Sequence, residues 1–587
     1  MSEQIQKIRG VVNNAICHKV ISVMKQNGFE TVRKFDRDTE TAYNTNKNLL
    51  RTLLSDNKNT EYGKKYKFGE IKSVAAYKKC VPLTTYDDYE SYIDRMTERG
   101  ERNLLTSYPI AYYASTSGTS GSPKKIPVTE QGLSIFQAYS SSAGFSIQKE
   151  FYENTKGKDA EAGKGLLLLS LKNEPLNDGV NFGSISSACL DDTKMKYIPY
   201  FITTPKEVLL STENTDLKYL HARYGLAERN VAYLCGSYIP ALLDLMNYIR
   251  DNHETLIKDI REGCLNESVT IPENMRKTLS EHLTPDPKRA DELEEAFSKG
   301  IDKDLMRRIW PKLSWVSAIW AGNFSSYARK LQEYSGRSLP YYTGTYVSSE
   351  GVFGMARHPY DQCYALIPGS CFYEFIPMDG KNGENESDNP PTLLLNQVEE
   401  GKEYELVITN QSGFYRYRMG DVIKVIGFYN ETPLVVFKYR KKNIVSIAGE
   451  KFTEDHLLSA VREFERRTDI NIVDFCMYPD KDAEPGRYVI LMEPEKAVPP
   501  KRYEECRNVL AEELARASTS YAHYIEGGNM GEPKLIFLQS QTFQLYREIK
   551  MFKTGLTENQ LKTVRVLTTP ELIKFFTGLE EKPIDSD

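Results

Sequence analysis

The chain has 587 residues and 40% of them are apolar, so it is long enough for several domains with large hydrophobic cores and is not a disordered protein. Its formal net charge is −5, which argues against nucleic acid as the main partner. Because no apolar stretch approaches about 18 residues and the N-terminus lacks the apolar segment of a signal peptide, we expect neither a membrane span nor export.

The first 105 residues are predicted to be mainly helical, and a strand-like segment, 110–114, follows them. This segment leads directly into a loop, 116–124, with the sequence TSGTSGSPK. After the loop, Thr129 is a candidate N-cap for a helix that carries Leu133, Phe136 and Tyr139 on one side. The predicted order is therefore strand, glycine-rich loop, helix, which is a context in which proteins bind phosphate.

The composition of this loop suits a polyphosphate. Gly118 and Gly121 allow backbone conformations that bring N–H groups close to a ligand, and the hydroxyl side chains add further donors. Lys124 or Lys125 adds positive charge. The P-loop pattern, in which Gly comes directly before Lys-Ser/Thr, is absent. A solvated Ser/Gly/Thr loop is the alternative interpretation.

The middle of the chain contains elements of both kinds. Residues 165–171 (GLLLLSL) are predicted to form a buried strand. Residues 240–310 are predicted to be helical, with a break at 284–287 and a charged, solvated face. From Phe372 the apolar period is two, which predicts an antiparallel barrel or sheet with strands near 372–376, 392–396, 403–409 and 415–426.

Beyond Arg440 the pattern restarts and predicts a small α+β domain. Thr453 is a candidate cap for a helix with Leu457, Val461 and Phe464 at helical spacing. The other predicted elements are strands near 470–477, 487–492 and 534–538 and a helix near 502–514.

Nine cysteines are scattered along the chain without CxxC pairs or tight Cys/His clusters. We therefore expect no thiolate metal site. The odd number leaves at least one thiol unpaired, and the pattern is typical of a protein of the reducing cytosol.

Two further stretches contain candidate ligands for a nucleotide. Glu350 ends the hydroxyl-rich run YYTGTYVSSEG, where one carboxylate beside a phosphate loop could bind Mg²⁺; a polar turn is the alternative. Asp421 follows Gly420 in SGFYRYRMGDVIKVIG, where a carboxylate could accept hydrogen bonds from ribose hydroxyls; a Gly-Asp hairpin turn is the alternative.

Taken together, TSGTSGSPKK, TYVSSE and YRMGD, in this order, resemble the motifs of the adenylate-forming superfamily. Within it, the chain resembles the plant auxin-responsive (Gretchen Hagen) acyl acid amido synthetases over residues of about 60–570. The strings that carry this likeness are IWPKLSWVSAIWAGNF, EYSGRSLPYYTGTYVSSEGVFG and SGFYRYRMGDVIKVIGF. In addition, NQLKTVR at 559–565 is similar to the family's Asn-Gln-Tyr-Lys-x-Pro-Arg.

The resemblance implies an α/β fold and an ATP- and Mg²⁺-dependent ligase. Residues 1–438 would form a large domain that binds ATP and the acyl substrate and has a β-barrel-like subdomain. Residues 439–587 would form a small, mobile α+β domain. The enzyme would convert a small carboxylic acid to acyl-AMP and then transfer the acyl group to an amine, in most members an amino acid.

The resemblance also implies an active site. The ATP β- and γ-phosphates would be held by the loop residues Ser117, Gly118, Thr119 and Ser120. The adenine and α-phosphate would lie beside Thr345, Tyr346 and Glu350, with Glu350 bridging through Mg²⁺. Asp421 would bind the ribose hydroxyls, and Arg440 would support the ribose or phosphate near the hinge.

The lysines implied to act from the small domain are Lys451 and Lys562. Leu561 and Val564 stand where the family has Tyr and Pro, so Lys550 and Lys553 are alternatives to Lys562. Residues 448–450 read Ala-Gly-Glu in place of the plant family's usual Asp-Ser-Asp. Two other functions share this sequence pattern: an acid–thiol ligase that makes an acyl-CoA, and an inactive binding protein on the same scaffold.

Overall fold

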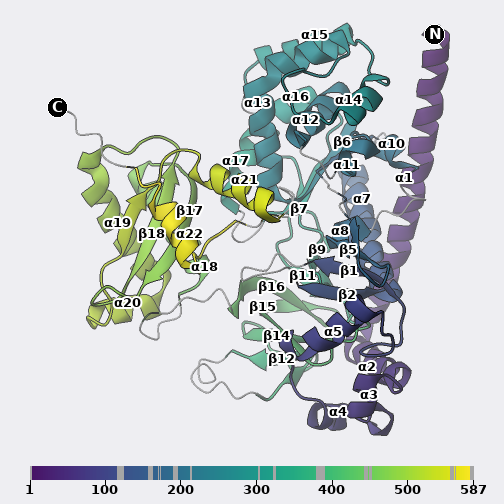
Figure 1. Ribbon diagram of the computed structural model, residues 1–587, viewed down its shortest axis with the longest axis vertical. Coiled ribbons are helices and arrows are strands. Elements are labelled where there is room, and N and C mark those ends of the chain that lie inside the picture. The colour runs from purple at the N-terminus through teal and green to yellow at the C-terminus, as the bar shows by residue number, and fades with distance from the viewer. Residues whose placement is uncertain are drawn as a thin grey trace. The chain divides into compact units, whose positions relative to one another are not determined.

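The computed structural model describes residues 3–115, 124–156, 163–168, 171, 173–188, 196–211, 215–301, 304–320, 325–378, 390–441, 447, 452–554, 561 and 563–581. The chain forms two compact units (Figure 1). The first unit consists of Met1–Met419 and Ile423–Phe437, and the second of Gly420–Val422 and Lys438–Asp587. The mixed α/β class expected from the sequence is confirmed.

The N-terminal part of the first unit is helical, as predicted. Thr60 and Ser73 cap two of its helices by accepting hydrogen bonds from the backbone N–H groups of Gly63 and Ala76. Its helices are α1 (Glu3–Glu40), α2 (Ala42–Asn57), α3 (Glu61–Lys65), α4 (Val74–Cys80) and α5 (Asp87–Arg99).

The predicted order around the glycine-rich loop was wrong in one respect. The loop joins two antiparallel strands, β1 (Ile110–Ser115) and β2 (Lys125–Thr129), and does not lead directly into a helix. Ile126 and Val128 are buried and pair with β1, so apolar burial makes this segment a strand. β1 and β2 belong to a four-stranded sheet with β5 (Asn181–Gly183) and β4 (Asn173–Pro175), in the order β2-β1-β5-β4.

The helix predicted after Thr129 is confirmed. The Thr129 hydroxyl accepts from the N–H of Gly132 at 3.1 Å and so caps α6 (Glu130–Phe136). A π-helical segment, η2 (Gln137–Ala143), and α7 (Gly144–Lys156) continue from it.

A parallel sheet with the order β3-β6-β7-β8 lies in the same unit. Its strands are β3 (Lys164–Leu167), β6 (Val231–Tyr238), β7 (Trp315–Ile319) and β8 (Tyr341–Tyr342). The helical region predicted for residues 240–310 is confirmed, and the break predicted at 284–287 ends where α15 (Pro287–Ser298) begins. The helices of this part of the chain are α8 (Ile185–Ala188), α10 (Ile198–Phe201), α11 (Lys206–Leu209), α12 (Leu217–Ala227), α13 (Ile239–Glu262), α14 (Glu273–Ser280), α15 (Pro287–Ser298), α16 (Leu305–Ile309) and α17 (Ser325–Ser335).

The four strands predicted from Phe372 onward are confirmed, and they form one sheet with three earlier strands and one later strand. Its order is β13-β12-β14-β15-β16-β11-β10-β9. The strands are β9 (Thr345–Ser348), β10 (Gly351–Met355), β11 (Tyr364–Leu366), β12 (Phe372–Pro377), β13 (Leu393–Leu394), β14 (Glu403–Thr409), β15 (Tyr417–Tyr429) and β16 (Thr432–Arg440).

The second unit has the predicted α+β character. Thr453 caps α18 (Glu454–Thr468), as expected, by accepting from the N–H of His456. A three-stranded sheet has the order β17-β18-β19, with β17 and β18 antiparallel and β18 and β19 parallel. The remaining elements are β17 (Ile472–Asp480), β18 (Arg487–Pro494), β19 (Lys534–Phe537), α19 (Tyr503–Ala517), α20 (Thr519–Glu526), α21 (Thr542–Thr554) and α22 (Pro570–Thr577). In the described part of the chain, no helix is both long and apolar enough to cross a membrane.

Candidate active site

The loop residues predicted to bind phosphate, Ser117, Gly118, Thr119 and Ser120, lie outside the described residues, but both ends of their loop are described. Ser115 ends β1 and pairs with Lys125. Lys124 places its ammonium group 4.3 Å from the centre of the Tyr86 ring, and burial raises the pKa of Tyr86 to about 12, so this ring stays uncharged. The Nζ atom of Lys125 is 3.5 Å from the hydroxyl of Thr97 in α5.

The Glu350 motif forms a tight β-hairpin. Ser348 in β9 pairs with Gly351 in β10, so Ser349 and Glu350 form a two-residue turn. The Ser349 hydroxyl donates to the backbone carbonyl of Ser115 at 3.1 Å. The hairpin turn is therefore bonded to Ser115, the residue directly before the glycine-rich loop, although the two residues are 234 positions apart in the sequence.

Hydroxyl and amide groups surround the half-buried Glu350. The Ser348 hydroxyl donates to Oε2 of Glu350 at 2.5 Å, and the Tyr417 hydroxyl lies 3.4 Å from Oε1. The side-chain amide of Asn410 donates to the backbone carbonyl of Glu350 at 2.8 Å. These bonds fix both the backbone and the carboxylate of the turn.

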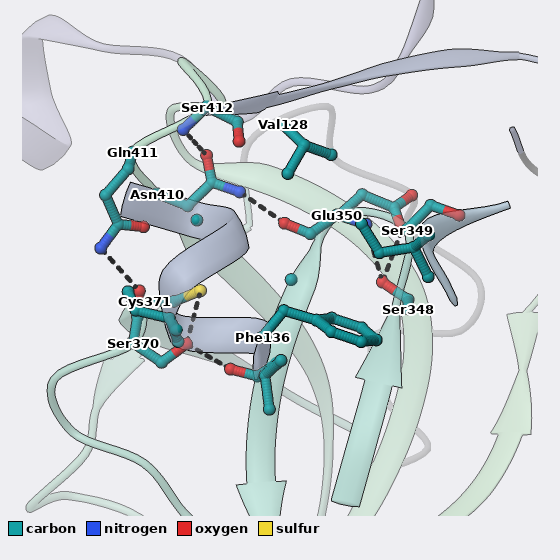
Figure 2. A pocket seen from close by; sticks show the side chains of 15 residues that line it. Val128, Phe136, Ser348, Ser349, Glu350, Ser370, Cys371, Asn410, Gln411 and Ser412 are labelled. Atoms are coloured by element: carbon teal, nitrogen blue, oxygen red, sulfur yellow. Dashed lines mark hydrogen bonds between the residues drawn. The ribbon is translucent and has the colours of Figure 1, made fainter. Parts of the chain in front are cut away.

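A pocket of about 390 Å³, part of it open to solvent, lies against this turn (Figure 2). Its apolar side includes Ile135 and Phe136 of α6, while Asn410 and the turn contribute polar groups. None of its lining residues carries a positive charge. The full lining is Val128, Gly132, Ile135, Phe136, Ile185, Ser348, Ser349, Glu350, Gly351, Val352, Ser370, Cys371, Asn410, Gln411 and Ser412.

The Glu350 carboxylate and the neutral oxygen groups around it fit Mg²⁺ that is bound together with a phosphate. Mg²⁺ is usually held by one or two carboxylates together with substrate phosphates and water, and Glu350 is a single carboxylate among neutral oxygen groups. Among the described residues, no group of three His, Cys, Asp or Glu side chains could hold a metal ion without a ligand. The site therefore suits a metal that arrives with phosphate.

Thr345 and Tyr346, at the start of the hairpin, are both buried, with 7% of each exposed. The Thr345 hydroxyl is 3.2 Å from that of Ser140. Tyr346 packs against Phe353, with ring centres 5.3 Å apart. The Tyr346 ring is thus part of the protein core and presents little surface to a ligand.

Asp421 and Arg440 form an ion pair. The Arg440 Nε donates to Oδ1 of Asp421 at 2.6 Å; the Asp421 side chain is 2% exposed and that of Arg440 38%. The alternative of a Gly-Asp hairpin turn was wrong, because β15 runs without interruption from Tyr417 to Tyr429. Gly420 has a φ of +77°, which favours glycine directly before the carboxylate.

Two arginines of the same YRYRMGD string were given no role by the sequence analysis. Arg416 is 2% exposed and forms an ion pair with Glu374, which is 1% exposed. Arg418 binds Glu405, whose side chain is 2% exposed. The alternation of Tyr and Arg in a predicted strand was the only available signal, because the acidic partners lie on two other strands of the sheet, β12 and β14.

Both candidate lysines of the second unit, Lys451 and Lys562, lie outside the described residues. The alternatives are on α21, where the Nζ atom of Lys550 is 5.7 Å from the centre of the Tyr546 ring and Lys553 is exposed. Arg565 ends the string that contains Lys562; its buried guanidinium binds the Asp474 carboxylate and donates to the backbone carbonyl of Phe475 at 2.7 Å.

Three family models match this chain. The GH3 family N-terminal domain matches residues 31–340, the central domain residues 364–440, and the C-terminal domain residues 455–571. The chain belongs to the GH3 family. The family predicted from the three motifs is therefore confirmed.

Named GH3 relatives match nearly the whole chain. The jasmonoyl–L-amino acid synthetase GH3.5 of Oryza sativa subsp. japonica is 30% identical over 563 residues, 91% of this chain and 94% of that protein. The putative indole-3-acetic acid-amido synthetase GH3.9 of Arabidopsis thaliana is 29% identical over 84% of this chain and 87% of that protein. These names confirm the prediction of an amido synthetase and favour it over the acyl-CoA alternative.

The solved structure of the AtGH3.15 acyl acid amido synthetase in complex with 2,4-DB matches this GH3 chain with a TM-score of 0.80 and 26% identity, over 95% of this chain and 97% of that one. A 2-hydroxyisobutyryl-CoA ligase in a postadenylation state matches with a TM-score of 0.51 and 9% identity, over 90% of each chain, which is a likeness of fold alone. Membership in a family of amido synthetases with this fold implies the use of ATP.

Proposed function

We propose that this GH3 protein activates a small carboxylic acid with ATP and Mg²⁺ and then joins its acyl group to the amine of an amino acid. The observation that carries the proposal is the hydrogen bond from Ser349 to Ser115, which holds the Glu350 turn at the start of the glycine-rich loop. A phosphate-binding loop beside a carboxylate is what an ATP-dependent reaction at the α-phosphate requires.

In the first step, an oxygen of the acid attacks the α-phosphorus of ATP, so that a P–O bond forms to the acyl group and the bond to pyrophosphate breaks. Ser117, Gly118, Thr119 and Ser120 hold the β- and γ-phosphates in this proposal. When bound, Mg²⁺ supplies positive charge that offsets the charge of the phosphates. Glu350 is the protein ligand that positions it.

The nucleoside end of ATP is held by other residues. Thr345 and Tyr346 form the base and α-phosphate side of the site, and Asp421 accepts from the ribose hydroxyls. Since Asp421 is 2% exposed and bonded to Arg440, the guanidinium must share or release the carboxylate when ribose binds.

In the second step, the nitrogen of the amine attacks the acyl carbonyl carbon and loses one proton to water, an amide forms, and AMP leaves with the electron pair of the broken C–O bond. Lys562 is the proposed partner of the α-phosphate in the first step, and Lys451 is a second lysine that the small domain brings to the active site. Residues 439–587 form a mobile small domain in this proposal, and its closure would keep water away from the acyl-AMP.

The proposed setting is the cytosol. The eight described cysteines are all free thiols, as a reducing compartment requires.

The proposal is tested by ATP–pyrophosphate exchange with Mg²⁺ across a panel of aryl, indolyl and aliphatic acids. Glu350→Gln keeps the size and one acceptor oxygen of the side chain but removes its charge, so we expect acid-dependent exchange to fall about 10²–10³-fold. Glu400→Gln, at an exposed position of the same unit, is the control and should exchange like the wild type.

Two results would contradict the proposal: no exchange with any acid, or equal exchange in the Glu350→Gln and wild-type proteins. A product assay then identifies the acceptor. Amides formed from amino acids are expected, and an acyl-CoA formed instead from coenzyme A would support the acid–thiol ligase.

A further inference from the structure

A row of aromatic side chains crosses three strands of the eight-stranded sheet. It consists of Tyr346 in β9, Tyr364 in β11 and Phe437 in β16. The ring centre of Tyr346 is 5.9 Å from that of Tyr364 and 6.2 Å from that of Phe437. These separations lie within the range in which aromatic rings attract one another. The three rings, which come from three different strands, thus form one continuous aromatic cluster.

Gly354 makes this row possible. It lies in β10, between β9 and β11, and pairs with Tyr346 on one side and Leu366 on the other. A Cβ atom at this position would be 2.8 Å from the Cβ of Tyr364 and 3.6 Å from that of Tyr346. Because glycine has no side chain, the rings of Tyr346 and Tyr364 can pack against each other across β10.

The three rings differ in exposure. Tyr346 and Tyr364 are each 7% exposed, whereas Phe437 is 43% exposed. Burial raises the pKa of Tyr364, so its ring stays uncharged. The tyrosines therefore form a neutral support, and Phe437 is the member of the row with an accessible face. In the chain, Phe437 precedes Arg440, which belongs to the same strand, by three residues.

We propose that Phe437 provides the surface on which the purine base of ATP stacks, with Tyr346 and Tyr364 as its support. The inference rests on the proposed function, which places the base beside Tyr346. Since Tyr346 is buried, the base meets the row at Phe437. A phenylalanine ring has no hydrogen-bonding group, so the contact recognises the flat face of a base and not its edge.

The test compares Phe437→Ala with Phe437→Trp and with Phe428→Ala. Phe428 is the matched control, because it is a phenylalanine of the neighbouring strand β15 and is 44% exposed. Three quantities are measured: the KM for ATP in the exchange assay, the Kd for ATP by calorimetry, and the inhibition constant of inorganic tripolyphosphate, which has no base. Thermal unfolding checks that each variant is folded.

Loss of one base–aromatic stack weakens binding by about 5- to 150-fold. We expect Phe437→Ala to raise the KM and Kd for ATP by a factor in this range, with inhibition by tripolyphosphate unchanged. Phe437→Trp should restore ATP binding, and Phe428→Ala should match the wild type.

ATP constants of Phe437→Ala within twofold of the wild type would overturn the inference. Equal weakening in Phe437→Ala and Phe428→Ala, or equal weakening of ATP and tripolyphosphate, would also overturn it, since the effect would then not come from the base. In these cases the proposed function still holds if the wild-type protein catalyses acid-dependent ATP–pyrophosphate exchange. A wild-type protein that binds no ATP overturns the proposed function itself.

Discussion

The buried ion pair between Arg416 and Glu374 allows a sharp prediction about stability. Arg416 is 2% exposed and Glu374 is 1% exposed. The guanidinium donates to Oε1 of Glu374 at 3.0 Å from Nη2 and to Oε2 at 3.0 Å from Nε. Its Nη1 also donates to the backbone carbonyls of Lys78 and Val81, at 2.9 and 2.8 Å. One side chain therefore satisfies a buried carboxylate and two carbonyls.

Arg416→Met removes all of these bonds at once. Breaking a buried ion pair by removing one partner costs about 3–5 kcal/mol, because a buried charge is left uncompensated. Each carbonyl that loses its donor adds about 1–3 kcal/mol. The total of about 5 kcal/mol or more is comparable with the entire free energy of unfolding of many domains, about 5–15 kcal/mol. We expect Arg416→Met to leave the first unit barely folded.

The assay is urea unfolding followed by tryptophan fluorescence. The chain has three tryptophans, Trp310, Trp315 and Trp320, and all lie in the first unit, so the signal reports the unit that contains Arg416.

Arg95→Met is the matched control. Arg95 forms a two-bond pair with Glu61 at 3.0 and 2.8 Å, but these side chains are 30% and 46% exposed. Its loss should cost at most about 1 kcal/mol. A double variant, Arg416→Met with Glu374→Leu, should be more stable than Arg416→Met, since it removes the uncompensated charge. Equal unfolding midpoints for Arg416→Met and Arg95→Met would refute the reasoning.

Three more predictions concern other parts of the chain. Burial lowers the pKa of His221 to about 4 from 6.5, so below pH 6.5 the unfolded chain takes up a proton that the folded chain does not, and the free energy of unfolding falls. Urea unfolding should show a loss of about 2 kcal/mol from pH 7 to pH 5, and this loss should disappear in His221→Gln. The same dependence of stability on pH in the variant and the wild type would contradict the prediction. Gly354→Ala places a Cβ 2.8 Å from the Cβ of Tyr364 and should destabilise the first unit by about 1–3 kcal/mol; an unchanged urea midpoint would show that the strands can separate. Lys562→Ala should slow single-turnover formation of acyl-AMP about 10²-fold or more with little change in the Kd for ATP, and a wild-type rate would exclude this lysine in favour of those on α21.

Local signals in the sequence predicted the elements well. Thr129 and Thr453 each precede a helix and cap it, because an N-cap bond forms within one turn of chain. The alternation from Phe372 onward predicted strands, because side-chain burial on a sheet has a period of two. The strand between the glycine-rich loop and the helix that follows Thr129 was missed, because its strand character comes from pairing with β1.

The candidate site was only partly predictable. The motifs led to the GH3 family and to Glu350, but the bond from Ser349 to Ser115 joins residues that are 234 positions apart. Tyr346 was expected at the base and is buried, whereas Phe437, which was given no role, has an exposed ring. Phe437 and Phe428 are almost equally exposed, and what distinguishes Phe437 is its contact with the Tyr346 ring, which depends on how the strands pair.

The sequence by itself determined the α/β class, the family and the chemical nature of the candidate ligands, since these depend on residue type, order and short-range periodicity. Only the tertiary structure decided which groups share an environment. The charged residues of YRYRMGD illustrate the difference: Arg416 and Arg418 bind carboxylates of β12 and β14, while Asp421 binds Arg440. A charge acquires a structural or a ligand-binding role from its partner and its burial, and both are set by how the strands of the sheet pair.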